Sequence, residues 1–164
     1  MQLITANGTR MNYIAASSVA MNAVAASSVA MNAVAASSVA MNAVAASSVA
    51  RTALYNAASI TEPILAKSSV AIGALKASSQ CATVSCTGAK GNYATAYNGK
   101  AFVLEVWTSN TGSYTSYHGN YIIGSSTASY TSTTAHQTVN RFASTVTGSF
   151  STTGWSQSAL IFKI

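Results

Sequence analysis

The decapeptide SSVAMNAVAA stands three times in succession, at residues 17–26, 27–36 and 37–46, and decides how the first half of the chain folds. Related units surround it: NGTRMNYIAA at 7–16, SSVARTALYN at 47–56, the eleven-residue AASITEPILAK at 57–67 and SSVAIGALKA at 68–77. A repeat of fixed length indicates a unit that cannot bury its apolar face alone and must stack on copies of itself or on other chains. The first half is therefore predicted to be a stalk or spacer rather than a catalytic body.

The repeat is rich in alanine, which favours helix over strand. Val at the third place of each decad, with Ala at the seventh and tenth, predicts an apolar stripe. Ten residues at about 100° each fall about 80° short of three turns, so a continuous helix would need a tightly wound coiled coil. The alternative is one short helix per decad, with serine as its N-cap. Asn7-Gly8, a turn signal, and Pro63, placed in a first turn behind Thr61 as cap, favour short helices. A β-helix of pentads is a third solution, which the weak strand propensity of alanine and serine disfavours.

Side chains this small would give a single stack of decads little core. We therefore expect several chains to pack or wind together, so that the stalk gains its rigidity from neighbouring copies. The stalk is predicted to occupy residues 1–79, including an N-terminal attachment segment, and a second domain residues 80–164.

The second half changes composition abruptly, and Thr, Ser, Tyr and Gly replace the Ala-Met-Val pattern near residues 78–86. Short runs separated by turn residues predict an antiparallel sandwich or barrel. In the first run we expect Phe102, Leu104 and Val106 to share one face. The predicted fold class is α+β, with an elongated helical-repeat stalk followed by a C-terminal β-sandwich. The predicted strands are Lys100–Ser109, Tyr114–Ile123, Thr138–Phe150 and Ser158–Ile164.

Charged residues make up only 6% of the 164 residues, which predicts that much of the surface is buried in an oligomer or covered by polar uncharged side chains. Because the cations are scattered singly, nucleic acid is not an expected partner; they supply solubility or a weak attraction to anionic surfaces. No run of 18 apolar residues exists, so no membrane insertion is expected, and the N-terminus lacks a signal-peptide pattern. The cations are Arg10, Arg51, Lys67, Lys76, Lys90, Lys100, Arg141 and Lys163.

Catalysis is not expected, because the second half holds one carboxylate, Glu105, and the chain has no aspartate. Glycoside hydrolysis normally needs two carboxylates, and His118 and His136 lack an aspartate to complete a serine triad. Cys81 and Cys86 do not have the spacing of a metal site. They are compatible with a disulfide within or between chains, or with two free thiols. No metal or cofactor is expected.

Binding has better support, because six of the eight tyrosines lie between residues 93 and 130 among Ser, Gly and Asn. Tyrosine supplies contact area at low entropic cost, and the small polar residues supply adaptable hydrogen bonds. The competing interpretation is that these aromatic residues build the sheet core, where Trp107 is expected. The candidate receptor-binding residues are Tyr114, Tyr117, His118, Tyr121 and Trp155.

The decads of AMNAVAASS type, followed by a Tyr/Ser/Thr-rich module with VNRFAS near its middle and IFKI at its end, resemble tail-fibre and related appendage proteins of tailed bacteriophages. The resemblance covers residues 7–164. It implies a homotrimer located in the virion, with a thin stalk joined to other tail or neck proteins and a distal β domain that binds a host-surface glycan or protein. The alternative is a purely structural virion component that grips another virion protein, such as a collar or neck whisker, a head fibre or a decoration protein.

Overall fold

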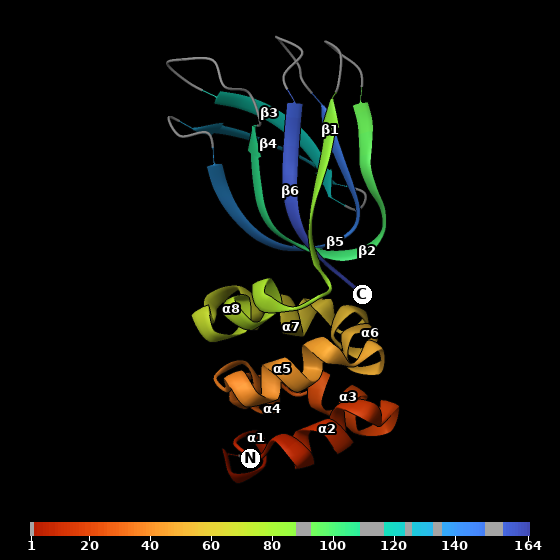
Figure 1. Cartoon of the computed structure of the whole chain (residues 1–164), viewed down its shortest axis with the longest axis vertical. Helices are drawn as coiled ribbons and strands as arrows, with labels where there is room; N and C mark the ends of the chain where they lie inside the picture. The colour runs from red at the N-terminus through yellow and green to blue at the C-terminus, as the bar shows by residue number, and fades with distance from the viewer. Residues whose placement is uncertain (1, 88–92, 109–116, 124–125, 133–135, 150–155) are drawn as a thin grey trace. The chain divides into compact units, whose positions relative to one another are not determined.

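The computed structural model describes residues 2–87, 93–108, 117–123, 126–132, 136–149 and 156–164, with side chains for residues 3–86, 95–107 and 157–164. These residues form eight helices and six strands, an α+β fold (Figure 1). They divide into two compact units, the helical unit (Met1–Cys81) and the sheet unit (Ala82–Lys163). The predicted boundary between residues 79 and 80 lies two residues before this division.

Each decad forms one short helix, as the capped alternative predicts. The helix ends because the first serine of each pair leaves the helical region; Ser27, for example, has φ −111° and ψ 113°. At this serine the helix axes of α3 and α4 turn by 100°. The continuous coiled coil and the β-helix are therefore wrong for this segment. The helices are α1 (Gln2–Thr5), α2 (Gly8–Ala16), α3 (Ser18–Ala25), α4 (Ser28–Ala35), α5 (Ser38–Ala46), α6 (Ser48–Asn56), α7 (Ala58–Lys67) and α8 (Ser69–Ala77).

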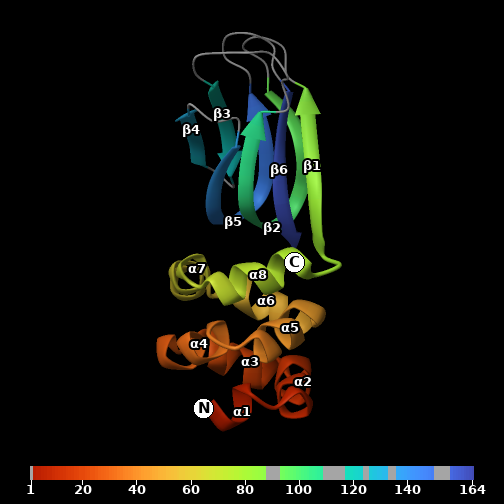
Figure 2. The same ribbon diagram turned by 60° about the vertical axis from the view of Figure 1, so that its left-hand side comes forward.

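Three decads make one turn of the helical unit, and each helix stacks on the helix three units before it. Helix α5 packs on α2, α6 on α3, α7 on α4 and α8 on α5. Figures 1 and 2 show the resulting layers from two directions. The helical unit is therefore a solenoid built by one chain. The prediction that neighbouring copies supply its rigidity is wrong, because the decads wind around their own axis and provide their own core.

The core of this solenoid is formed by position 5 of the decads, counting the first serine as position 1. Methionine occupies it in four successive units and is at most 1% exposed; position 9, usually alanine, is buried beside it. The predicted stripe through positions 3, 7 and 10 is wrong, since Val19 and Val29 at position 3 are 80% and 75% exposed. In helices this short, burial depends on the turn above or below rather than on one continuous face. The buried methionines are Met11, Met21, Met31 and Met41.

The first serine of a decad also joins one turn to the turn below. Ser47 Oγ accepts a hydrogen bond from the Ala50 N–H (3.2 Å) and donates one to the carbonyl of Ala15 (2.5 Å), 32 residues earlier. Because a hydroxyl both accepts and donates, serine can serve both helices, whereas an aspartate carboxylate only accepts. Ser37 and Ser68 make the same pair of contacts, donating to the carbonyls of Thr5 and Ala35 respectively.

Helix α7, from the eleven-residue unit, departs from this pattern. Ala57 takes the serine place and makes no side-chain cap hydrogen bond. The predicted placement of Pro63 in a first turn behind Thr61 is wrong, because α7 begins at Ala58 and contains Pro63 in its interior. Thr61 is instead fully buried and donates from Oγ1 to the carbonyl of Leu54 (2.8 Å).

Arg51 occupies the core position that methionine holds in the preceding decads, so its predicted role in surface solubility is wrong. Its side chain is 7% exposed, and burial lowers its pKa because the charged form is desolvated. One guanidinium nitrogen donates to the carbonyl of Ala45 (2.9 Å), while Nε has no hydrogen-bond partner. Because its pKa is lower in the fold than in the unfolded chain, the charge reduces stability at neutral pH.

We expect Arg51→Met to stabilise the helical unit by about 1–3 kcal/mol, because it replaces a buried cation by the side chain that the other decads use. The gain is smaller than the full desolvation cost, since the Ala45 carbonyl loses its donor. Thermal unfolding followed by circular dichroism measures the change. Arg10→Met, at an exposed position, is the matched control and should leave the melting temperature equal to that of the wild-type chain within experimental error. A lower melting temperature for Arg51→Met would contradict the account of this residue.

The sheet unit contains one six-stranded sheet in the order β1-β6-β2-β5-β3-β4. Strand β2 pairs antiparallel with β5 and β6, and β3 pairs antiparallel with β4 and β5. The four predicted strands correspond to β2, β3, β5 and β6, while β1 and β4 were not predicted. The strands are β1 (Cys81–Thr87), β2 (Tyr93–Thr108), β3 (Tyr117–Ile123), β4 (Ser126–Ser132), β5 (His136–Ser149) and β6 (Ser156–Lys163).

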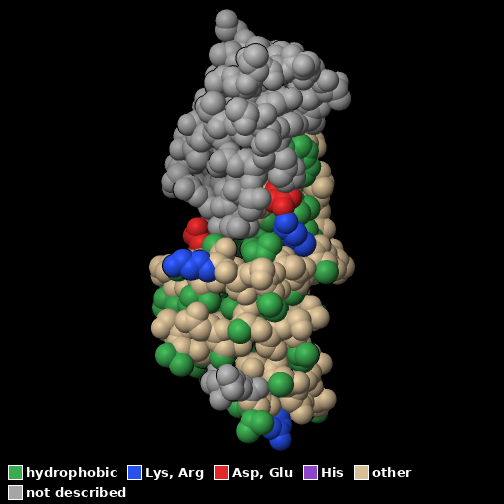
Figure 3. Space-filling model, turned by 90° about the vertical axis from the view of Figure 1, so that its left-hand side faces the viewer, with side chains coloured by type: hydrophobic (Ala, Val, Ile, Leu, Met, Phe, Trp, Pro, Cys, Tyr) green, Lys and Arg blue, Asp and Glu red, His purple; other side chains and the backbone are tan. Residues whose placement is uncertain are grey.

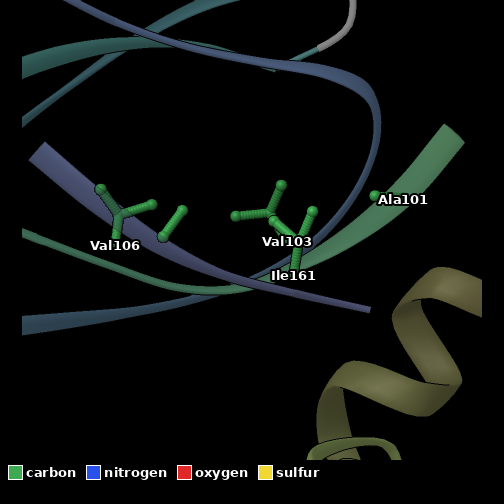
Figure 4. Close-up of a cluster of buried hydrophobic side chains, with 5 residues drawn as sticks. Ala101, Val103, Val106 and Ile161 are labelled. Carbon is green, nitrogen blue, oxygen red and sulfur yellow. The ribbon is translucent and has the colours of Figure 1, made fainter. Parts of the chain in front are cut away.

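Irregular pairing bends the two longest strands, β2 and β5. Their register shifts between Thr95 and Tyr97, between Asn98 and Ala101, and between Val103 and Glu105. Residues 101–108 of β2, which follow the first two shifts, pair with β6. Residues 93–95 of β2, which precede them, pair with residues 147–149 of β5, at the end of β5 that also pairs with β3. Ala96 and Tyr97 lie at the first shift and pack against a buried hydrophobic cluster. The members of this cluster are Ala101, Val103, Val106, Ala159 and Ile161 (Figure 4).

The expected alternation in β2 is wrong at Val106. The register shift between Val103 and Glu105 places Val106 in the same cluster as Val103, not on the face of Phe102. Phe102 is nevertheless buried, and its ring stacks on Phe162 with 5.7 Å between centroids. Trp107, expected in the core, is only partly buried. Both faces of this part of β2 therefore carry buried residues.

Candidate functional site

The candidate receptor-binding residues fall in the least described part of the chain. Tyr117, His118 and Tyr121 belong to β3, but their side chains lie outside the described residues. Tyr114 and Trp155 lie outside the described residues altogether. The structure therefore places three of the five on one strand and does not test the other two.

The backbone register of the β3–β4 hairpin adds a third tyrosine to this group. Gly119 of β3 lies opposite Tyr130 of β4, and the pairing runs without a bulge from Tyr117 to Ile123. Because residues two apart on a strand share a face with their cross-strand partners, Tyr117, Tyr121 and Tyr130 occupy the same face of the hairpin. Tyr130 is not among the candidates predicted from the sequence, and no strand is predicted between residues 123 and 138. The alternation in TASYTS was the signal that could have found it.

The two edges of the sheet are also distinctive. Strand β4 forms one edge and β1 the other. Their sequences, STASYTS and CATVSCT, contain no charged residue and no proline. Natural edge strands commonly carry such residues, which prevent pairing with another chain. Both edges of this sheet are therefore chemically open to strand pairing.

The two cysteines lie on the same edge strand and form no disulfide with each other. Residues five apart on a strand are separated by about 16–17 Å, whereas the Cα atoms of a disulfide lie about 4.4–6.8 Å apart. The prediction of a disulfide within the chain is wrong for this physical reason. Cys86 is buried and Cys81 is partly exposed, so a bond between chains stays a prediction for Cys81.

Few side chains that could act in catalysis or bind a metal lie in the part of the chain that the structure describes. Glu105 lies in the middle of β2 and is partly buried, and Glu62 lies on α7. No three His, Cys, Asp or Glu side chains among the described residues lie close enough to hold a metal ion. The side chains of His118 and His136 lie outside the described residues.

The helical unit offers shallow grooves between its stacked helices. One groove of about 300 Å³ lies between α3 and α6 and is bordered by uncharged side chains, which are the polar Ser18, Asn22, Ser48, Thr52 and Asn56 and the apolar Val49 and Ala53. Figure 3 shows that the visible side of this unit is dominated by uncharged atoms, with few basic or acidic side chains. The hydroxyl and carboxamide groups of this groove can form hydrogen bonds with a neutral polar ligand, but they do not form a catalytic arrangement.

No single described helix is long and apolar enough to cross a membrane; α3 and α4 meet that requirement only together, as a pair bent by 100°. Comparison with known proteins adds no relative: the chain matches no protein-family model, and no curated protein is similar enough to it to count as a match.

Proposed function

We propose that this chain is a structural appendage protein of a tailed bacteriophage, a tail fibre whose sheet unit binds a glycan or protein on the host surface. The observation that carries the proposal is the decad array, which resembles such fibres in sequence and which forms a solenoid with its own core. A rod of stacked helices suits a spacer. The group formed by Tyr117, Tyr121 and Tyr130 gives the sheet unit a candidate binding surface.

The proposed assembly is a homotrimer in the virion, and its support comes from the resemblance and from the sheet unit. The helical unit gives no reason for a trimer, since it needs no second chain for its core. The uncharged edges β1 and β4 can join successive copies by strand pairing, and closing the proposed trimer into a ring in this way would leave no edge unpaired. We further propose that the bent sheet forms a sandwich, because Ala96 and Tyr97, which lie at the first register shift of β2, pack against the cluster that follows them.

Binding of the labelled full chain to a panel of intact bacteria tests the receptor-binding role. We expect saturable binding to at least one strain, weakened about tenfold or more by the triple change Tyr117→Ala, Tyr121→Ala and Tyr130→Ala. The matched control is Tyr13→Ala, which removes an exposed tyrosine of the helical unit. Light scattering in the same preparations should give three times the chain mass of 16.7 kDa.

A purely structural role is the second candidate, and the self-sufficient solenoid favours it because a strut needs nothing else. Under this alternative the sheet unit grips another virion protein. Failure to bind any of the cells, with antibody labelling at the neck or capsid of intact particles, would replace the first candidate by the second. A monomer in light scattering would contradict the trimer in either case.

A further inference from the structure

The N-terminal end of the solenoid carries its most exposed large hydrophobic side chains. Leu3 is 84% exposed, Tyr13 77%, Val19 80% and Val29 75%. They all lie in the first helices, α1 to α4. Hydrophobic side chains are visible at this lower end of the helical unit in Figure 3.

The same decad positions become covered as the solenoid grows. At position 3, exposure falls from 80% at Val19 and 75% at Val29 to 39% at Val39 and Val70. Val39 shows the cause, because α5 stacks on α2 and a Cβ on Gly8 would lie 3.6 Å from Val39 Cγ1. At position 3, Val39 therefore packs onto the small position-2 residue Gly8 of the helix one turn below.

Position 7 follows the same trend. Ala23 is exposed and Ala33 half-buried, whereas Ala43 and Ala53 are 7% and 3% exposed. Positions 3 and 7 are four residues apart and so lie on one side of a helix, which is the side that faces the turn below.

Two serine hydroxyls at this end also lack the contact that their counterparts make in later turns, within the described residues. In later turns, the first serine donates to a position-9 carbonyl of the turn below, as Ser37 and Ser47 do. The hydroxyls of Ser17 and Ser27 accept from the N–H groups of Ala20 and Ala30 but, within the described residues, donate to nothing. This end thus repeats the apolar and donor groups that hold one turn on another.

We propose that this N-terminal face, defined by Leu3, Tyr13, Val19, Ala23 and Val29, is a docking site for another protein that ends in a turn of short helices. The partner must offer what the lower turns of this chain offer: small residues at position 2 and open C-terminal carbonyls at position 9. Contacts inside the chain show that this chemistry fits, since Val39 of α5 packs on Gly8 of α2 and Ser47, the N-cap of α6, donates to the Ala15 carbonyl of α2. A second copy docked face to face would bring donors against donors and leave Ser17 and Ser27 unsatisfied. The inference does not depend on receptor binding by the sheet unit.

The test uses the full chain and, as probe, a fluorescent 30-residue peptide with the sequence of residues 17–46, which supplies three decads. A repeat array can fold a further unit against its end, so the peptide should fold as it binds. We expect saturable binding in fluorescence anisotropy, weakened at least tenfold by Val19→Lys with Val29→Lys. Asn22→Lys with Asn32→Lys is the matched control: it adds the same charge to the same helices at exposed position 6 and should change nothing. A scrambled peptide should not bind.

A second experiment tests the same complementarity within one chain, where weak binding of the free peptide does not matter. The chain is extended at its N-terminus by the same three decads, and we expect its helical circular dichroism signal to rise by the contribution of the added residues. An extension that stays unfolded would overturn the complementarity, and a folded extension without peptide binding would overturn docking in trans. Self-association of the wild-type chain that is lost in Val19→Lys with Val29→Lys would identify a second copy as the occupant and overturn the choice of partner. Host-cell binding by that variant should be unchanged, which separates this proposal from the proposed function.

Discussion

Replacing Ser47 by alanine is expected to destabilise the helical unit by about 2–4 kcal/mol. Loss of the N-cap costs about 1 kcal/mol, and leaving the partly buried Ala15 carbonyl without its donor adds about 1–3 kcal/mol. Urea unfolding followed by circular dichroism measures the free energy.

Ser27→Ala is the matched control for this change. Ser27 caps α4 in the same way but, within the described residues, donates to no lower turn. Its loss should therefore cost only about 1 kcal/mol. Ser47→Thr keeps both the acceptor and the donor and should restore most of the stability. Equal costs for Ser47→Ala and Ser27→Ala would show that the hydroxyl contact between turns contributes nothing.

Met41→Ala is the second change with a large expected effect. Met41 is fully buried in the middle of the methionine core, with helices stacked on both sides of α5. Truncating a buried methionine to alanine costs about 2–5 kcal/mol, because apolar contacts are lost and a cavity remains. The midpoint of urea unfolding should fall accordingly.

Asn42→Ala, one residue further along the same helix, provides the comparison. Asn42 is exposed, so its replacement should change stability by no more than about 0.5 kcal/mol. Met41→Leu should lose less than about 1.5 kcal/mol, since it nearly conserves the buried volume. If Met41→Ala were as stable as Asn42→Ala, the methionine side chains would not form the core.

The sequence was informative where local chemistry decides the structure. The Ser-Ser pairs predicted the ends of the helices because capping acts within four residues of the chain. The stacking of three decads per turn was not predictable in the same way, since it depends on the corner angle at each serine and on contacts 32 residues apart. The misassigned stripe and the expected dependence on other chains both follow from that missing geometry.

The sheet unit shows a similar division. The apolar runs around Phe102 and Ile161 predicted strands, whereas β1 and β4, which contain no such apolar run, were missed. The bulge after Val103 reversed the expected face of Val106, and the local alternation of the sequence does not indicate this bulge. For the candidate site, sequence supplied Tyr117 and Tyr121, but only the hairpin register joined Tyr130 to them.

The central claim is that a single chain winds its decads into a solenoid with three helices per turn. A distance between spin labels on Asn22 and Thr52 tests it most directly, because both residues border the groove between stacked helices α3 and α6. The labels are placed at cysteines introduced there, with Cys81→Ser and Cys86→Ala as the background. Stacked helices lie about 8–10 Å apart, so the labels should be within about 20 Å of each other, and dilution with unlabelled chain should not change this. A distance near 45 Å, expected for 30 residues of continuous helix, or a short distance that disappears on dilution, would contradict the account.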